Sequence, residues 1–465
     1  MHLRMVAAVS LALAFSAPAV AHQPLLITNV TIIDPYDGSR RPNASVLIVK
    51  GRIVRIGPPL RAPRGVETFD ATGKFLVPGL WDMHVHVWEP GQLRLYIANG
   101  VTAVRNAGGK LDELTTWRKQ VASGSLIGPR MFIAGPVLDG TNPVHPDHSI
   151  AVPSAAAAAV AVERLARAGA DFVKVYDRLG KAEFLAVAAE AKKRGLKLTG
   201  HVPDSMSAIE AASAGMRIID HLDGLIEACT PHEESYRKGL TSWPDLLQSW
   251  NQSRADALMQ SLIASNTWQV PALVVSHTPA MVSFTPIRPR LRYATRAQRE
   301  MWSAPDNPFF LNRTPGRLET AMLHYDVANI LVGQMRELGL QVMAGSDADG
   351  APFQIPGFSL HDELHLLVDA GYTPMEALRS ATVLPARFFG VMADYGPIGP
   401  GRIADLLLVD ADPTSDIMNI HRIHAVVTNG RLFRRNDLDA LFLAVEKENE
   451  AGLGEIGNRS KFYLA

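Results

Sequence analysis

The interpretation of the whole chain depends on one stretch of sequence, Leu76-Val77-Pro78-Gly79-Leu80-Trp81-Asp82-Met83-His84-Val85-His86. Its apolar residues predict a strand over 75–83 that is buried on both faces. Because residues i and i+2 of a strand point to the same side, His84 and His86 would project together from the strand's end. Two imidazoles held in this way suit a divalent metal ion, while two half-buried structural histidines are the simpler alternative.

Outward from this strand the sequence alternates strand and helix patterns. Helical patterns over 155–168, 181–193, 205–214 and 317–338 separate apolar strands. Repeated β-α units of this kind imply parallel strands joined by crossover helices. An α/β fold with a (β/α)8 barrel of TIM type over 75–394 is therefore favoured over an open doubly wound sheet. The seven further strands are expected at 101–105, 130–134, 171–176, 196–201, 216–221, 269–275 and 340–346.

Both ends of the chain are rich in β patterns. Short strands separated by turn residues fill 22–74, and similar patterns return over 395–440. Two such ends around a barrel predict a small β-sandwich domain built from both of them. Residues 441–465 are expected to form a C-terminal helix or tail.

Residues 1–21 differ from the rest of the chain. Arg4 precedes an apolar run over 5–15, and Ala19-Val20-Ala21 offers small residues for cleavage. This pattern predicts a signal peptide cleaved near Ala21, and hence a periplasmic or secreted protein. The run is shorter than the roughly 20 apolar residues that span a bilayer, so no stable membrane anchor is expected.

The composition narrows the class of function. Lys+Arg and Asp+Glu both count 46, so no excess charge points to nucleic acid or to an anionic membrane. Cys229 is the only cysteine, which excludes an internal disulfide and a thiolate cluster. No GxGxxG or GxxxxGK[ST] motif follows a strand, which weakens a nucleotide-binding interpretation. A small-molecule partner is expected instead.

One long segment, 277–316, interrupts the alternation after the seventh strand. It is rich in proline and also carries Trp302, Phe309 and Phe310. Long loops inside compact domains are usually functional or disordered, and this one would lie on the catalytic face of a barrel. We expect it to act as a lid over the site.

The predicted strand ends collect residues that bind metals. In a parallel barrel the active site lies at the carboxyl ends of the strands. A lysine inside an apolar strand is hard to explain structurally, because burying an unpaired ammonium is costly. The candidates that converge on this rim are His84, His86, Lys174, His201, His221 and Asp347.

With these strand ends the chain resembles the amidohydrolase superfamily. It is most similar to the imidazolonepropionase-related branch, which includes bacterial Xaa-Pro dipeptidases and ochratoxinase-like amidases. The resemblance covers nearly the whole chain after the signal peptide. It rests on the opening stretch, on the strand-end residues, and on the motifs at 100–106, 377–382 and 396–405.

The resemblance implies a binuclear metal centre. His84, His86 and Asp347 would hold one divalent ion, while His201 and His221 would hold the other. Lys174 would be carboxylated by CO2, and its carbamate would bridge both ions. This chemistry needs a neutral amine, and burial lowers the pKa of a lysine. Zn2+ is the first expectation for the metal.

The resemblance also implies the reaction. A hydroxide bridging the ions would attack a small amide, such as an Xaa-Pro dipeptide or an N-acyl amino acid, and cleave its C–N bond. Asp347 would accept a proton and pass it to the leaving nitrogen. An ochratoxin-type amidase and a lactonase or ester hydrolase are alternatives, and a non-catalytic binding protein is a more remote one. A homo-oligomer is expected from the family.

Further rim residues are candidates for contacts with the substrate. Tyr176 and His277 are expected to assist catalysis by steadying the oxyanion. His145 and His148 are candidates for binding the substrate. Arg288 would clamp a substrate carboxylate, although arginines in this segment also fit an ordinary solvated face.

Overall fold

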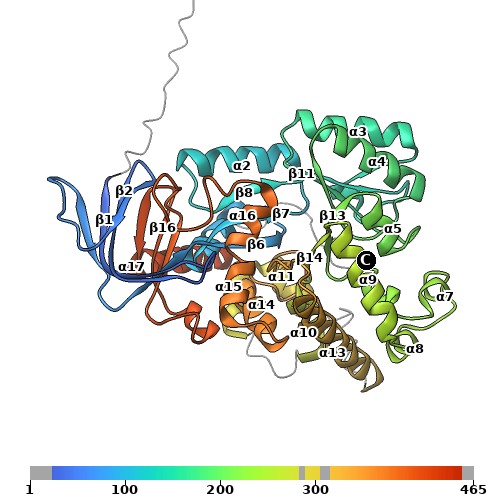
Figure 1. Ribbon diagram of the computed structural model, residues 1–465. Helices are drawn as coiled ribbons and strands as arrows, with labels where there is room; N and C mark the ends of the chain where they lie inside the picture. Colours follow the sequence, from blue (N-terminus) through green and yellow to red (C-terminus); the bar gives the residue numbers. More distant parts are fainter. Residues whose placement is uncertain (1–22, 282–287, 304–314, 453–465) are drawn as a thin grey trace, which may run out of the picture.

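The structure, a computed structural model, describes residues 23–281, 288–303 and 315–452. Figure 1 shows a β-sheet unit at one end of the molecule and α7 and α8 at the other. Parallel strands covered by helices lie between them. The helices are α1 (Leu93–Ala98), α2 (Leu111–Ser123), α3 (Ala155–Arg167), α4 (Lys181–Lys193), α5 (Ala208–Ser213), α6 (Leu225–Ala228), α7 (Glu233–Arg237), α8 (Trp243–Gln248), α9 (Gln252–Ala264), α10 (Leu273–Met281), α11 (Arg296–Ser303), α13 (Pro315–Glu337), α14 (Phe358–Asp369), α15 (Pro374–Ser380), α16 (Val383–Phe389) and α17 (Arg435–Glu450).

Strands from both chain ends form the β domain. β15 pairs antiparallel with β5, with Leu407 opposite Val77, and so joins the two ends. Hydrogen bonds link the strands into one sheet of order β17-β16-β15-β5-β1-β2-β3, with β4 beside β1, where two facing sheets were expected. The strands are β1 (Leu25–Ile33), β2 (Arg40–Val49), β3 (Arg52–Gly57), β4 (Glu67–Asp70), β5 (Phe75–Pro78), β15 (Leu406–Val409), β16 (Ile423–Thr428) and β17 (Arg431–Arg434).

The central strands have the parallel arrangement of a TIM-barrel-type fold. β6, β7 and β8 form one parallel sheet, and the other strands form a second of order β10-β9-β11-β12-β13-β14. Helices α3 and α4 have the bounds expected from sequence to within a residue. The strands are β6 (Leu80–Val85), β7 (Val101–Asn106), β8 (Arg130–Ile133), β9 (Val137–Asp139), β10 (Ser149–Ala151), β11 (Phe172–Val175), β12 (Lys197–Gly200), β13 (Met216–Asp220) and β14 (Trp268–Val270).

The eighth predicted strand, 340–346, is not a regular strand. It lies between β14 and β6, and the bridges there are isolated ones, from Val342 to Gln269 and from Ala348 to Val85. Gly345 explains the close approach, because a Cβ there would lie 2.5 Å from the Val270 side chain. Within the described residues, the two parallel sheets therefore meet on this side without a continuous hydrogen-bonded ladder.

The predicted first strand, 75–83, is divided between the two units. β5 belongs to the β domain and β6 to the parallel strands, and the chain changes sheet at Gly79. A Cβ on Gly79 would lie 2.2 Å from Oγ1 of Thr102, so no side chain fits at the crossing point. The prediction of one continuous strand was wrong because the apolar pattern is the same in both sheets.

The segment expected to be a long loop, 277–316, contains helical turns. The seventh predicted strand, 269–275, ends early because Pro271 has no N–H to donate and Ala272 has a positive φ of 46°. Residues 273–275 instead begin α10. The short helix η3 (Arg288–Tyr293) and helix α11 follow. Residues 282–287 and 304–314 lie outside the described part of the chain, so the lid function stays a prediction.

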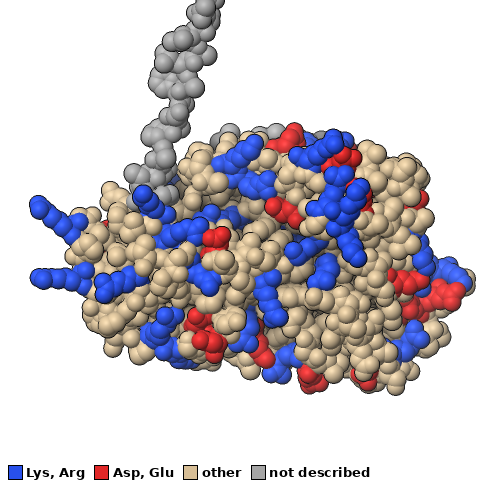
Figure 2. Space-filling view, turned by 45° about the horizontal axis from the view of Figure 1, so that its top comes forward, with Lys and Arg blue, Asp and Glu red and all other residues tan. Residues whose placement is uncertain are grey.

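The carboxyl end is anchored on the same side as α11. Helix α17 begins at Arg435, earlier than the expected tail, and packs against α1 and η3. Residues 453–465 lie outside the described part, as does the predicted signal peptide. On the face that Figure 2 draws, basic side chains spread over the surface and project from its left end, while acidic ones gather mainly toward the lower and right-hand edges. The full sequence has a net charge of zero. Across the described residues, each helix is too short or too polar to cross a membrane.

Candidate metal centre

His84, His86 and Asp347 form the heart of the site. His84 and His86 come from the end of β6, and Asp347 follows the eighth strand segment. Oδ1 of Asp347 lies 3.4 Å from Nε2 of His84 and 3.3 Å from Nε2 of His86. All three side chains are buried. One carboxylate oxygen thus lies close to both imidazoles.

His221 and His201 extend the cluster along the ends of β13 and β12. The His221 ring lies 4.5 Å from the His84 ring and 5.2 Å from the His201 ring, between centroids. Ligand atoms of His84, His221 and Asp347 lie within 4.8 Å of one another, a spacing that can hold a metal ion. The histidines expected to bind two separate ions are therefore neighbours.

Lys174 reaches the cluster through Asp220. Its Nζ lies 2.8 Å from Oδ2 of Asp220, while Oδ1 of Asp220 lies 3.1 Å from Nδ1 of His84. Arg105 holds the same carboxylate with two nitrogens, at 3.0 and 3.1 Å. Because Arg105 can neutralise Asp220 alone, Lys174 can lose its charge without leaving a buried carboxylate unpaired.

Burial sets the protonation states that a metal requires. It lowers the pKa of His84 well below its ordinary value and that of His221 to about 4, so both rings are neutral at pH 7. Burial also lowers the pKa of Lys174, although Asp220 acts in the opposite direction. For Asp347, burial is outweighed by the neighbouring His221, His86 and His84, which lower its pKa. Neutral imidazoles and an ionised carboxylate are ready to bind a cation.

The backbone is bent to present these ligands. His221 and Asp347 have left-handed φ angles of 59° and 53°, which each cost about 1–3 kcal/mol for residues with a side chain. Neighbouring strand ends hold both bends, since the N–H of His221 donates to Val270 O and that of Asp347 to His84 O. A Cβ on Gly350 would lie 2.3 Å from Oδ1 of Asp347, so a glycine is needed beside the ligands.

The donor set fits divalent metal ions. The buried ring nitrogens of His84 have carboxylate oxygens close to them, Asp220 at 3.1 Å from Nδ1 and Asp347 at 3.4 Å from Nε2. Nδ1 of His221 is buried without a hydrogen-bond partner among the described residues. Buried polar atoms are normally satisfied, so nitrogens gathered around a carboxylate point to a cation. His201 has an orienting partner, because its Nδ1 lies 2.7 Å from Oδ1 of Asp177 and its Nε2 stays available.

Tyr176, His145 and His148 lie on the rim of this cluster. The Tyr176 ring stacks on the His201 ring at 4.2 Å, and its hydroxyl lies 3.2 Å from Nε2 of His145. His148 contacts the Trp88 ring at 4.6 Å, and Trp88 in turn stacks on His86. These three rim residues therefore lie within one or two contacts of the predicted ligands.

For two other predicted site residues, His277 and Arg288, no contact among the described residues joins them to the cluster. His277 lies in α10, where its ring packs edge-to-face against Tyr325 of α13 at 5.0 Å. Burial lowers the pKa of His277, and the acidic groups that oppose this shift, Asp362 and Asp369, belong to α14. Arg288 begins η3, but its side chain lies outside the described part.

Sequence reasoning missed several carboxylates that support the ligands. Asp220, directly before His221, is the shared partner of Lys174 and Arg105. Asp82, two residues before His84, accepts hydrogen bonds from the N–H and Oγ of Ser346 at 2.9 and 2.5 Å. The alternation of a strand put Asp82 on the same side as His84, so the pattern Asp-x-His-x-His contained this signal.

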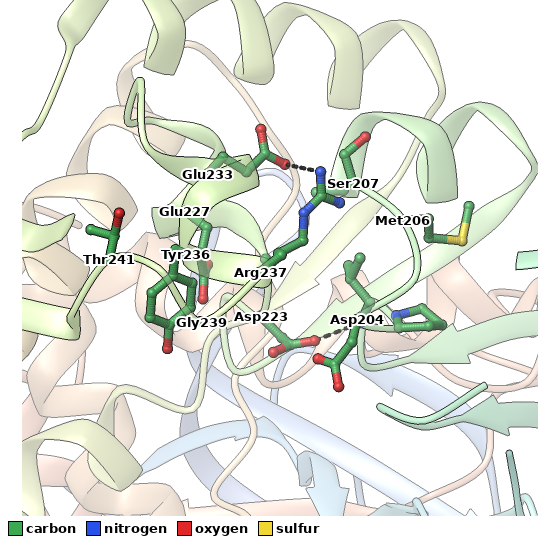
Figure 3. A pocket seen from close by; sticks show the side chains of 14 residues that line it. Asp204, Met206, Ser207, Asp223, Glu227, Glu233, Tyr236, Arg237, Gly239 and Thr241 are labelled. Atoms are coloured by element: carbon green, nitrogen blue, oxygen red, sulfur yellow. Dashed lines mark hydrogen bonds and ion pairs between the residues drawn. The ribbon is translucent and has the colours of Figure 1, made fainter. Parts of the chain in front are cut away.

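A cavity of about 400 Å³ opens beside the centre, between the loops that follow β12 and β13 (Figure 3). Arg237 is the only basic residue among those that line it, and it faces Glu233 at 3.8 Å. The other acidic lining residues are Asp204, Asp223 and Glu227. With carboxylates in excess, this side of the rim disfavours an anionic group of a substrate.

Comparisons with known proteins agree with this arrangement. Residues 324–433 match the profile of the amidohydrolase family. The fold is similar to that of bottromycin amidohydrolase, with a TM-score of 0.72, 24% identity and 94% of each chain covered. The family profile thus covers part of the chain, and the structural likeness shows a shared fold. A Xaa-Pro dipeptidase solved with bound methionine is similar too, with a TM-score of 0.67 and 19% identity over 89% of this chain and all of the other.

Sequence relatives match this chain over short stretches. A dihydroorotase of Solibacter usitatus is 48% identical over 68 residues, which are 15% of this chain and 15% of that protein. The match thus spans a small part of the length of such a relative. The structural likeness therefore extends to the TIM-barrel-type fold and the β domain, while the substrate must be argued from the site.

Proposed function

We propose that the protein is a binuclear metal-dependent hydrolase that cleaves the amide C–N bond of a small substrate. The observation that carries this proposal is the convergence of His84, His86, Lys174, His201, His221 and Asp347 from separate strand ends into one buried cluster. Neutral imidazoles around an ionised carboxylate, with a buried lysine beside them, form a donor set that suits divalent cations better than a purely structural role.

His84, His86 and Asp347 would hold one ion, and His201 and His221 the other. Lys174 would bridge them as a carbamate. Its neutral amine would form an N–C bond with CO2 and release a proton, which leaves an anionic ligand beside the ions. Arg105 keeps Asp220 neutralised throughout this change. The ions, for which Zn2+ is the first choice, would supply a nucleophilic water at neutral pH and polarise the substrate carbonyl.

The chain's own residues would then move the proton and hold the substrate. Asp347 is ionised, so its carboxylate can accept a proton from the attacking water and give it to the leaving nitrogen. Burial raises the pKa of Tyr176 well above its ordinary value, so its hydroxyl stays a donor. With Oη steadied at 3.2 Å from His145, Tyr176 can donate to the carbonyl oxygen as negative charge develops there.

The substrate is the finer part of the proposal. An Xaa-Pro dipeptide or an N-acyl amino acid fits a superfamily site, and a dipeptidase is among the structural neighbours. A screen of Xaa-Pro dipeptides, N-acyl amino acids, ochratoxin-like amides and lactones would identify the preferred bond. Turnover of lactones alone would replace the amidase proposal with that of an ester-type hydrolase on the same centre.

Metal analysis and one variant test the centre. The purified protein should contain close to two divalent ions per chain. Lys174→Ala should lower kcat by more than about 100-fold and reduce the metal content, because the bridging ligand is lost. Added acetate should restore part of the activity, since a free carboxylate can occupy the vacated space.

The matched control for this test is Lys181→Ala, which removes an exposed lysine in α4. It should leave both metal content and kcat unchanged. A Lys174→Ala protein that keeps two ions and full activity would contradict the proposal of a carbamate on Lys174. A wild-type protein with one ion would reduce the site to a mononuclear type.

We also propose export, on the basis of the apolar run over 5–15 and the Ala19-Val20-Ala21 site. The amino-terminal residue of protein recovered from the native cell envelope or medium should be His22. Recovery of full-length chain from the cytosol alone would refute this. A homo-oligomer, expected from the family, can be tested by light scattering on the same sample.

A further inference from the structure

We propose that a second pocket, at the opposite end of the parallel strands from the metal centre, binds a small dianion. The pocket has a volume of about 470 Å³. One wall is the segment 339–342, at the amino-terminal end of the eighth strand position. Asp347 of the metal cluster follows the carboxyl-terminal end of the same position. Tyr36 from the β1–β2 turn and residues of α15 and α16 complete the walls. This pocket therefore shares no lining residue with the metal cluster.

The charge inside the pocket is basic. Arg336, Arg379 and Arg387 line it, against a single carboxylate, Glu376. One oxygen of that carboxylate is already engaged, since Oε2 accepts hydrogen bonds from Nε of Arg336 at 2.9 Å and from the N–H and Oγ1 of Thr373 at 2.7 and 2.8 Å. No carboxylate of the described chain pairs with Arg379 or Arg387. Two guanidinium charges are thus left to be matched by a ligand.

Arg379 is held where an anion would meet it. Nε of Arg379 donates to the carbonyl oxygen of Pro35 at 2.7 Å, which fixes the side chain and joins α15 to the β domain. Arg387 extends from α16 with an exposed side chain. A preorganised guanidinium loses less entropy on binding and matches carboxylate or phosphate oxygens in pairs.

Tyr372 gives a second, independent sign of a missing partner. It lines the same pocket and is only 8% exposed, yet its hydroxyl has no hydrogen-bond partner among the described residues. A buried hydroxyl without a partner costs free energy. Because this hydroxyl is closed off from solvent, an anion or its bound water would recover that free energy after a small displacement of the ring toward the pocket. Leu384 and Met392 give the pocket an apolar side. The ligand is therefore a small phosphate or dicarboxylate that carries a short apolar part.

Such a ligand would connect three parts of the molecule. It would contact Tyr36 of the β domain, the arginines of α15 and α16, and the segment around Val342. Val342 precedes Asp347 by only five residues. Binding should therefore stabilise the folded protein, by an amount that grows with ligand concentration.

Inorganic phosphate is a suitable probe, measured by calorimetric titration of the full metal-loaded protein at constant ionic strength set with chloride. The wild type should bind saturably. The double variant Arg379→Gln with Arg387→Gln should bind at least about tenfold more weakly. Arg387→Gln alone, an exposed position that cannot upset folding, should weaken binding to a smaller extent. Arg55→Gln, an exposed arginine of β3, should bind as the wild type does.

Phosphate can also bind metal ions, so the Lys174→Ala variant separates the two sites. Binding that survives in Lys174→Ala and is lost in the double arginine variant supports the pocket. Binding lost in Lys174→Ala and kept in the double variant assigns phosphate to the metal centre and overturns the proposal. Absence of saturable binding to the wild type, or equal binding to the double variant, overturns it as well.

Discussion

Asp220 is the residue on which the electrostatics of the metal centre depend. Its carboxylate is completely buried and lies within 3.1 Å of His84, Arg105 and Lys174. Burial alone would raise its pKa, yet the charges of Arg105 and Lys174 hold that pKa well below the ordinary value. The carboxylate therefore stays ionised and keeps two buried cations satisfied.

Replacing Asp220 by Asn should damage both stability and metal binding. Arg105 would lose its ionic partner in a buried site, which costs about 3–5 kcal/mol when one member of a buried ion pair is removed. The free energy of unfolding from urea titration and the metal content of the purified variant measure these effects. Asp439→Asn, which breaks an exposed pair with Arg435, is the matched control and should change stability by less than about 1 kcal/mol. Equal stability of the two variants would contradict the role assigned to Asp220.

At the scale of residues, sequence predicted which side chains gather better than which carboxylates lie beside them. His84 and His86 lie together as predicted, because strand alternation and strand ends fix where side chains point. Asp220 was missed because a carboxylate next to a histidine is common and has no spacing of its own. His277 was proposed from its place after a predicted strand, but that part of the chain is helical and turns its ring toward Tyr325.

At the scale of elements, the turn between β5 and β6 is the point where a single methyl group matters most. Gly79→Ala would place a Cβ 2.2 Å from Oγ1 and 2.4 Å from Cγ2 of Thr102, which is buried in β7. We expect a loss of stability of about 1–3 kcal/mol, the usual cost of overpacking a core. Adding Thr102→Ala should recover part of it, because both of these atoms are then removed. Gly399→Ala, where the nearest atom would be 3.9 Å away, should be neutral in the same thermal denaturation assay.

His324 makes the contact between α13 and α8 sensitive to acid. Its ring packs edge-to-face on Trp243 at 5.2 Å, and burial lowers its pKa to about 4. Below pH 6.5, His324 is protonated in the unfolded chain but stays neutral in the folded protein. The free energy of unfolding therefore falls as the pH drops toward 4. The contribution at pH 5 is on the order of 1–2 kcal/mol.

The test compares unfolding free energies at pH 7 and pH 5. His324→Gln should lose less stability than the wild type over this interval, whatever its stability at pH 7. His365→Gln, at a histidine whose side chain is 46% exposed, should follow the wild type. An identical loss in His324→Gln and wild type would contradict the role of this contact.

Helices and strands were predictable where the hydrophobic pattern is compatible with only one kind of secondary structure. Helix α4 was predicted with its observed bounds because its apolar and charged residues follow a helical period between clear ends. The apolar run at 75–83 and the run at 269–275 were misjudged for a physical reason. Hydrophobicity does not reveal which sheet a buried strand joins, and it does not outweigh Pro271, which ends β14.

At the scale of the whole molecule, parallel strands and a β domain from both ends followed from the order of the elements. The pairing of strands between distant parts of the chain could not be predicted from that order. Pairing of β15 with β5 is a contact between residues more than 300 positions apart, and no local pattern specifies it. The irregular eighth segment was equally hidden, since its departure from a strand arises where Gly345 packs against Val270 and the backbone of His84.

This connectivity would give bound metal ions a structural role. His84 and His86 belong to the three-stranded sheet, His201 and His221 to the six-stranded sheet, and Asp347 to the segment between them. Isolated bridges rather than a continuous ladder join the sheets there, so bound ions would act as cross-links. Removing them with a chelator should lower Tm, because binding to the folded state alone contributes about 2.7 kcal/mol at 100 times Kd.

Scanning calorimetry of the protein before chelation, after chelation and after Zn2+ is returned measures this effect. The loss should be reversible in the wild type and much smaller in Lys174→Ala, which binds metal poorly from the outset. The Lys181→Ala control should behave as the wild type. If chelation removes the ions and leaves Tm unchanged, the sheets are held together by packing alone. The ions would then be required for the chemistry and not for the fold.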